Sequence, residues 1–165
     1  MSPEITLRSA READIPGMME ISLSGDTAAR WTAQQWVDIF DPQSPPRLVL
    51  VAERPGTLPK ICGFLVAQLP PVGLAEGDCE LENIAVDPIM RRRGLGLRLL
   101  QELLNRAQIQ RSAHVMLEVR RSNETAIALY RSCGFGIAGT RRKYYQNPDE
   151  DALIMQWPLP PAAMT

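Results

Sequence analysis

The chain has 165 residues, 45% of them hydrophobic and 22% charged, and its formal net charge is -1. That length is sufficient for one domain with a substantial buried core. The near-neutral charge excludes the global basicity that is typical of nucleic-acid-binding proteins. The N-terminus lacks the basic start and apolar run of a signal peptide, and no apolar run approaches the roughly 18 residues that span a membrane. We therefore expect a cytoplasmic protein with no membrane or nucleic-acid partner.

In the first half of the chain, apolar periodicity and capping residues indicate two helices and three strands. Asp14 is placed to cap the first helix, which should end near Gly25. Thr32 is placed to cap the second, which Asp41-Pro42 should stop. The predicted strands are residues 5–8, 47–52 and 61–69.

The second half alternates strands with helices. A loop rich in proline and glycine at residues 70–77 leads into it. The helix after Gly94 carries leucines on one face and should pack on a sheet. Asn123 is placed to cap the next helix, residues 124–132, and Gly134 to end it. The predicted strands are residues 79–86, 115–119, 137–145 and 152–157.

This order of elements predicts an α/β fold. Helices between consecutive strands imply crossover connections and parallel pairing, whereas the early hairpin implies antiparallel pairing. We expect a single mixed central sheet of about six to seven strands with helices on both faces. Residues 1–157 would form one domain, and residues 158–165 a proline-rich tail.

The stretch from Glu82 to Leu104 is the first candidate site. A strand ending at Asp87-Pro88 is followed by Arg91-Arg92-Arg93-Gly94-Leu95-Gly96 and then by an amphipathic helix. A glycine-rich turn at a helix N-terminus presents backbone N–H groups and a positive dipole end, and this arrangement binds phosphate groups. Metal binding is not expected, since the only histidine is His114 and the three cysteines, Cys62, Cys79 and Cys133, lack metal-site spacing.

Two blocks of sequence resemble the GCN5-related N-acetyltransferases. The first is Arg91-x-x-Gly94-x-Gly96 after the strand, and the second is Leu117-Glu118-Val119-Arg120 with the helix around Tyr130 and Cys133-Gly134-Phe135. The details are similar to the RimI branch, whose enzymes acetylate the N-terminal alanine of ribosomal protein S18. The resemblance covers about half the chain, residues 82–157. One departure is the Arg-Arg-Arg run, because relatives often have a glutamine there.

The resemblance implies an acetyl-coenzyme A site and a pair of catalytic residues. Glu118 would be the general base and Tyr130 the general acid. Main-chain groups of one strand would pair with the pantetheine arm, the glycine-rich turn would wrap the pyrophosphate, and one asparagine would hydrogen-bond the cofactor near its thioester. In that order, these implied cofactor-binding residues are Ile84, Ala85 and Val86, then Arg91, Arg92, Arg93, Gly94, Leu95, Gly96 and Leu97, and finally Asn123.

An N-terminal amine is the easier acceptor for a carboxylate base. Near pH 7.5, making a lysine neutral costs roughly 4 kcal/mol, whereas an α-amine costs well under 1 kcal/mol. Glu80 or Glu82 could serve as the base instead, since alternate residues of a strand share a face. Trp31, Tyr144 and Tyr145 are candidates for lining the acceptor groove.

Three functions follow from these expectations. The first is an N-alpha-acetyltransferase that transfers acetyl from acetyl-coenzyme A to the N-terminal alanine of a protein, with ribosomal protein S18 as partner. The second keeps the fold but takes a small-molecule amine as acceptor. The third is a coenzyme A-binding module without catalysis.

Overall fold

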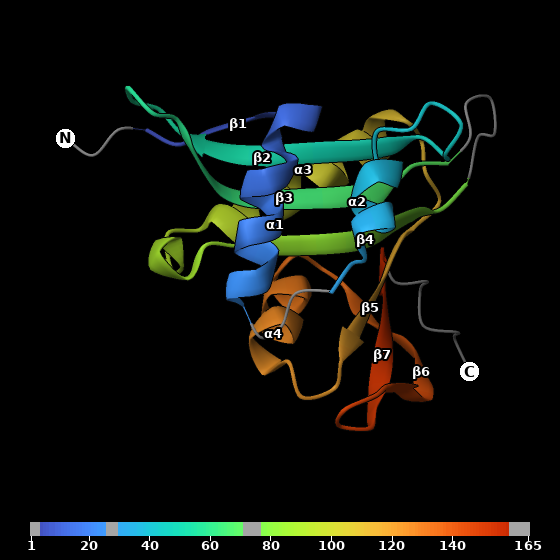
Figure 1. Cartoon of the computed structure of the whole chain (residues 1–165). Coiled ribbons are helices and arrows are strands. Elements are labelled where there is room, and N and C mark those ends of the chain that lie inside the picture. The colour runs from blue at the N-terminus through green and yellow to red at the C-terminus, as the bar shows by residue number, and fades with distance from the viewer. Residues whose placement is uncertain (1–3, 26–29, 71–76, 159–165) are drawn as a thin grey trace.

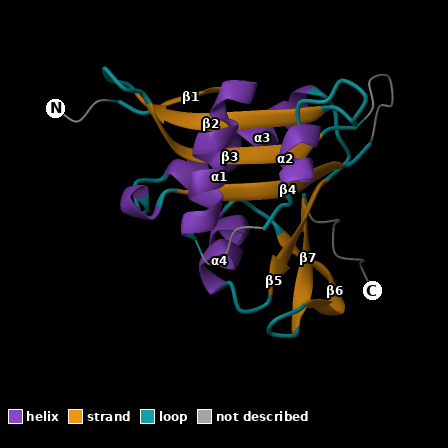
Figure 2. Ribbon diagram, viewed as in Figure 1, coloured by secondary structure: helices purple, strands orange, loops and turns teal. Residues whose placement is uncertain are grey.

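A seven-stranded mixed sheet forms the centre of the protein (Figures 1 and 2). It is seen in a computed structural model that describes residues 4–25, 30–70 and 77–158. The strand order is β1-β2-β3-β4-β5-β7-β6, and all neighbouring pairs are antiparallel except β4 and β5. This confirms the predicted α/β fold. Most of the predicted loop at 70–77 and nearly all of the predicted tail lie outside the described residues.

The elements follow the predicted order with small changes at their ends. The strands are β1 (Thr6–Ser9), β2 (Arg47–Arg54), β3 (Lys60–Gln68), β4 (Cys79–Val86), β5 (Val115–Arg120), β6 (Gly136–Tyr145) and β7 (Glu150–Trp157). The α-helices are α1 (Ile15–Ser24), α2 (Ala33–Asp38), α3 (Leu95–Ile109) and α4 (Glu124–Ser132), and short 3-10 helices are η1 (Glu12–Asp14) and η2 (Pro88–Met90).

Local capping explains where several helices begin. The Thr32 hydroxyl accepts a hydrogen bond from the Gln35 N–H, and the Asn123 carboxamide accepts one from the Ala126 N–H, as predicted. Asp14 was expected to cap α1 in the same way, but its carboxylate instead accepts from the Arg8 guanidinium and the Arg11 N–H. Its cap bond is therefore replaced by a tertiary ion pair.

Helix α2 is shorter than predicted. It ends at Asp38, and the chain up to Asp41 continues through tighter turns, in which Phe40 N donates to Val37 O and Asp41 N to Asp38 O. Such three-residue hydrogen bonds commonly finish a helix. The helix thus ends before Asp41-Pro42, which begins a further turn closed by the hydrogen bond from Ser44 N to Asp41 O.

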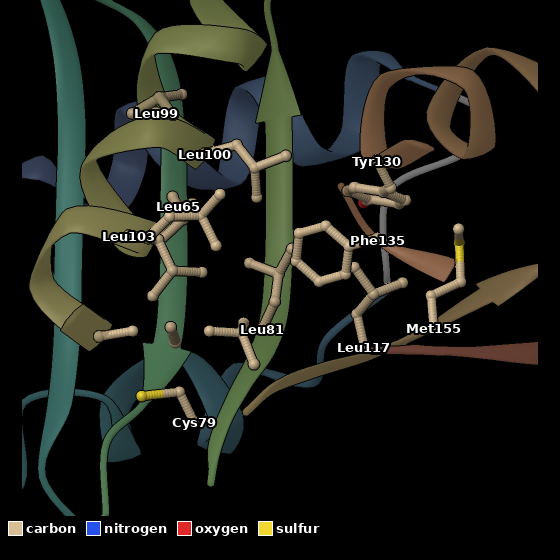
Figure 3. Packing of buried hydrophobic residues seen from close by; sticks show 14 of the residues in the cluster. Leu65, Cys79, Leu81, Leu99, Leu100, Leu103, Leu117, Tyr130, Phe135 and Met155 are labelled. Carbon is tan, nitrogen blue, oxygen red and sulfur yellow. The ribbon is translucent and has the colours of Figure 1, made fainter. Parts of the chain in front are cut away.

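Helices cover both faces of the sheet, as predicted. In Figure 1, α1 and α2 lie in front of β2, β3 and β4, and α3 lies behind them. The front core contains Met18, Trp36 and Phe64, while the larger rear core joins the leucines of α3 to the sheet and to α4. Figure 3 shows part of this rear core, with Tyr130 beside Phe135. The two cores fix the sheet between the helical layers.

The sheet separates between β4 and β5. These parallel strands pair only from Cys79 to Leu81 on β4, opposite Val115 to Leu117 on β5. Beyond this short ladder β5 turns away from β4, as the lower half of Figure 1 shows. The residues that follow on the two strands, Glu82–Val86 and Glu118–Arg120, are thus left on opposite sides of an opening.

A β-bulge lies at the same place on β4. Val66 of β3 pairs with Asn83 and the next residue, Ala67, pairs with Leu81, so Glu82 is an extra residue on β4. As a result Leu81 and Ile84, three positions apart, both pack on the rear core. The strict alternation of side chains along β4 is therefore interrupted at Glu82.

Candidate active site

A cleft of about 1180 Å3 occupies the opening between β4 and β5. Its walls come from β4, the turn before α3, β5, α4 and the end of β6, with α2 contributing at one side. Of the residues implied by the resemblance, those that line the cleft are Ile84, Ala85, Val86, Arg91, Arg92, Gly94, Leu95, Gly96, Leu97, Glu118, Asn123 and Tyr130. Arg93 is exposed and does not line it.

The N-terminus of α3 forms one end of this cleft. Gly94 precedes the helix with a φ of 74°, a left-handed conformation that glycine adopts without steric cost. The first helical hydrogen bond runs from Arg98 N to Gly94 O at 3.0 Å, so the N–H groups of residues 95–97 precede it and point out of the helix end. This end suits a phosphate group.

Gly96 of α3 lies against Leu129 of α4 and near Val86 of β4. A Cβ at this position would be 3.3 Å from the Leu129 Cδ2 atom and 3.9 Å from the Val86 Cγ2 atom. A larger side chain would therefore crowd the junction of α3, α4 and β4 beside the cleft. The two glycines thus have different roles. Gly94 adopts the left-handed backbone conformation before the helix, and Gly96 leaves room for the side chains of Leu129 and Val86.

The strand β4 contributes an edge to the cleft. Ile84, Ala85 and Val86 pair with β3 on one side, opposite Leu65, Phe64 and Gly63. On the other side the ladder with β5 has already ended at Leu81. An extended ligand could add to this edge by main-chain hydrogen bonds, as in β-strand addition. The residues present therefore fit a pantetheine arm leading away from a pyrophosphate at α3.

Glu118 is held at the cleft by two residues of β6. Its Oε1 atom is 2.8 Å from the Arg141 Nε atom. Tyr144 lies near the same carboxylate, and its pKa is raised above its usual range by hydrogen bonding to Glu118 and by the negative charge of that residue. Tyr144 and Tyr145 both line the cleft. The predicted base is thus an ion-paired, half-buried carboxylate.

Glu80 and Glu82 lie on the cleft wall opposite Glu118 and differ from each other in their contacts. The pKa of Glu80 is raised by burial and by the negative charges of Glu82 and Glu118. Glu82 instead forms an ion pair with Arg47, with 2.6 Å between its Oε2 atom and the Arg47 Nε atom. With Asp38 of α2, the cleft therefore carries four carboxylates, of which Glu82 and Glu118 are paired with arginines.

Tyr130 is buried where α4 meets the cleft. Its side chain is only 6% exposed and its ring centroid is 5.8 Å from that of Phe135. Burial raises the pKa of Tyr130, so the phenol stays protonated across the physiological range. A protonated hydroxyl beside a cleft can donate a proton.

Several contacts at the cleft carry no signal in the sequence. Arg47 and Glu82 form an ion pair although they are 35 positions apart in the sequence. Arg141 on β6 contacts Glu118 on β5 although these two strands are not adjacent in the sheet. Gln35 and Asp38 of α2 also line the cleft. Trp31 lines it too, as expected, with its ring 4.9 Å from that of Trp36.

Within the described ranges, no three histidine, cysteine, aspartate or glutamate side chains gather as a group that could hold a metal ion. The same part of the chain contains no helix that is long and apolar enough to cross a membrane.

The chain is similar in sequence to known N-acetyltransferases. The [ribosomal protein bS18]-alanine N-acetyltransferase of Escherichia coli K12 is 49% identical over 102 residues, which are 61% of this chain and 66% of that protein. The aligned part is thus just under two thirds of that relative. A putative enzyme of the same description from Bacillus subtilis is 31% identical over 155 residues, 94% of this chain and 96% of that one.

The fold matches as well. The crystal structure of the ribosomal-protein-S18-alanine N-acetyltransferase from E. coli superposes with a TM-score of 0.80 at 31% identity, covering 98% of this chain and 99% of that one. Residues 16–135 match the model of the acetyltransferase (GNAT) family. The predicted family is therefore confirmed, and the chain belongs to the acetyltransferase (GNAT) family.

Proposed function

We propose that this protein transfers an acetyl group from acetyl-coenzyme A to the α-amine of an N-terminal alanine, and that ribosomal protein bS18 is the acceptor. The similarity to the E. coli and B. subtilis relatives supports the acceptor. The observation that carries the chemistry is the position of Glu118 and Tyr130 in one cleft with the glycine-rich end of α3.

In this proposal acetyl-coenzyme A supplies the activated thioester. The N–H groups at the start of α3 would bind its pyrophosphate, with Arg91, Arg92 and Arg93 adding positive charge. The edge of Ile84–Val86 would hold the pantetheine arm. Asn123 already uses its side-chain oxygen to cap α4, so its amide N–H groups are the ones available to the cofactor.

Glu118 would accept a proton from the acceptor amine, directly or through one water. An α-amine has a pKa of about 7.7–8.0, so a carboxylate base suffices near neutral pH. Tyr130 would donate its phenolic proton to the departing thiolate. Its raised pKa supports this role, because the proton is still present when the sulfur leaves.

The test is acetyl transfer to matched peptides. A peptide that opens Ala-Arg is incubated with the protein and acetyl-coenzyme A, beside the same peptide blocked at its N-terminus and carrying an internal lysine. Mass spectrometry should find one acetyl group on the free α-amine and none on the blocked peptide. Equal modification of both peptides would exclude α-amine selectivity.

The carboxylates of the cleft favour one second candidate, acetylation of a small cationic amine. Within the described contacts Glu80 lies within ion-pair distance of no arginine, unlike Glu82 and Glu118, and it could attract a polyamine. Including spermidine as a third acceptor separates the candidates, since a polyamine enzyme would modify it faster than the Ala-Arg peptide.

We further propose that residues 1–157 form a single acetyltransferase domain that works in the cytoplasm. The family match over residues 16–135 supports the single domain. Limited proteolysis of the full chain should leave one stable fragment of this extent.

A further inference from the structure

Strand β6 contains an irregular stretch next to Glu118. Arg141 pairs with Ala152 of β7 and Tyr145 pairs with Glu150, so the three residues between them stand opposite Asp151 alone. Lys143, in the middle, has a φ of 50°, and its N–H donates to the Asp151 carboxylate at 2.9 Å. The stretch is thus a bulge closed by its own hydrogen bond.

The bulge brings Arg141 and Tyr144 to the same carboxylate. In a regular strand, residues three apart point to opposite faces of the sheet. Here the Arg141 Nε atom forms an ion pair with Glu118 at 2.8 Å, and the same carboxylate raises the pKa of Tyr144. The Arg141 guanidinium also lies 5.5 Å from the centre of the Tyr144 ring. Arg141 and Tyr144 therefore form one group beside Glu118.

Arg141 has to cross strand β7 to make this contact. The sheet order places β7 between β5 and β6. On β7, Ala152 pairs with Arg141 and Ile154 pairs with Glu118. Ala152 and Ile154 are two positions apart, so these side chains lie on the same side of the sheet. Ala152 is a small, buried side chain, which leaves room for the long arginine to pass over it. The ion pair between Arg141 and Glu118 thus depends on how β5, β7 and β6 are paired with one another.

The arrangement leaves Glu118 with capacity for a further partner. An ionised carboxylate has about four lone-pair sites, and the closest Arg141 contact is to one oxygen, Oε1. Other groups near Glu118 are Glu80 on β4, which repels it, and Tyr145 on β6. A cation on the β6 side therefore holds the carboxylate against this repulsion while its free lone pairs remain available at the cleft.

We propose that Arg141 is a positioning residue, which together with Tyr144 holds the Glu118 carboxylate in the orientation that receives the acceptor's proton. This inference rests on the proposed role of Glu118 as general base. It assigns to the bulge of β6 a function in the chemistry, although none of its residues has to touch the reacting atoms.

A double-mutant cycle tests whether Arg141 acts through Glu118. Arg141→Gln should lower kcat for the Ala-Arg peptide by on the order of tenfold with little change in KM for acetyl-coenzyme A, because a misplaced base slows the chemical step. Arg141→Lys should recover part of the loss, since lysine keeps the charge but not the planar fork. Arg142→Gln, the exposed neighbour outside the cleft, is the matched control and should retain full activity.

In the Glu118→Gln background, Arg141→Gln should have almost no further effect on kcat, because residues that act as a unit are not additive. If the two losses multiply instead, Arg141 acts independently of Glu118 and the inference is wrong. An Arg141→Gln protein as active as Arg142→Gln would overturn it too.

A crystal structure of the Arg141→Gln protein gives a readout that does not depend on the acceptor. The Glu118 carboxylate should move away from its present position, whereas in Arg142→Gln it should stay. An unmoved Glu118 in Arg141→Gln overturns the inference whatever the activity. If the wild-type chain fails to modify the Ala-Arg peptide but Glu118 moves as expected, the acceptor assignment fails and the positioning of Glu118 by Arg141 stands.

Discussion

Leu81 and Leu117 form the last pair that joins β4 to β5. Both side chains are buried in the rear core, and the next residue on β5 is Glu118. The ladder between β4 and β5 ends at this pair, and the sheet opens immediately after it. Backbone polar groups on the facing edges beyond the pair need water or a ligand as partner. The cleft is thus a consequence of where the strand pairing ends.

Replacing Glu118 by glutamine removes the proposed base but keeps its size. We expect kcat to fall by at least roughly 100-fold, since general-base catalysis contributes about 10²–10⁴-fold. Affinity for acetyl-coenzyme A, measured by calorimetry, should be nearly unchanged. Glu20→Gln on the exposed side of α1 is the control. Undiminished turnover of Glu118→Gln would leave Glu80 and Glu82 as the candidates.

Tyr130→Phe removes only the hydroxyl of a buried ring. The ring can still pack beside Phe135, so the free energy of unfolding should change by no more than about 1.5 kcal/mol. Turnover should nevertheless fall by on the order of 100-fold, because the thiolate loses its proton donor. Urea unfolding and peptide acetylation are measured on the same preparation. Unchanged turnover in a folded Tyr130→Phe protein would mean that the acid is another group.

Gly94→Ala tests the turn before α3. Nothing lies within 4 Å of a Cβ at this position, so its cost is one of backbone conformation alone. With φ at 74°, we expect the protein to be destabilised by about 1 kcal/mol and acetyl-coenzyme A to bind more weakly. Gly139→Ala is the control, since its Cβ would make an ordinary 3.6 Å contact with the Ile154 Cδ1 atom. Full affinity in Gly94→Ala would show that the phosphate site tolerates a changed turn.

Asp14→Asn tests the ion pair that ties η1 to the sheet. Hydrogen bonds from Arg8, and then from the Arg11 N–H, lower the pKa of the buried Asp14 below its ordinary value. A carboxylate with a lowered folded pKa stabilises the protein above its unfolded pKa of about 3.9, and this contribution is lost as the pH falls through the folded pKa.

The stability difference between the wild type and Asp14→Asn should therefore be largest at neutral pH, about 1–3 kcal/mol, and shrink toward pH 3. Urea unfolding at several pH values measures it. Glu12→Gln, an exposed neighbour in the same 3-10 helix, is the control. A difference that does not change between pH 7 and pH 3 would contradict the assigned cause.

Local signals explain the elements that were predicted well. Strand β4 and helix α4 have the predicted bounds, Cys79–Val86 and Glu124–Ser132. The apolar residues of β4 are consecutive in the sequence, and α4 lies between an asparagine cap and a terminating glycine, so both elements are set by nearby residues. The end of α2 and the partner of Asp14 were predicted wrongly. In both places the outcome depends on contacts or turn hydrogen bonds that no periodicity describes.

The sequence by itself determined the family, the order of elements and the motif residues that the cleft brings together, since these depend on short motifs and on side-chain chemistry. Tertiary structure alone decided how those residues are held. The bulge at Glu82 and the opening after Leu81 come from pairing between strands. The contact of Arg141 with Glu118 needs the register of β5, β7 and β6 together, which no local pattern encodes.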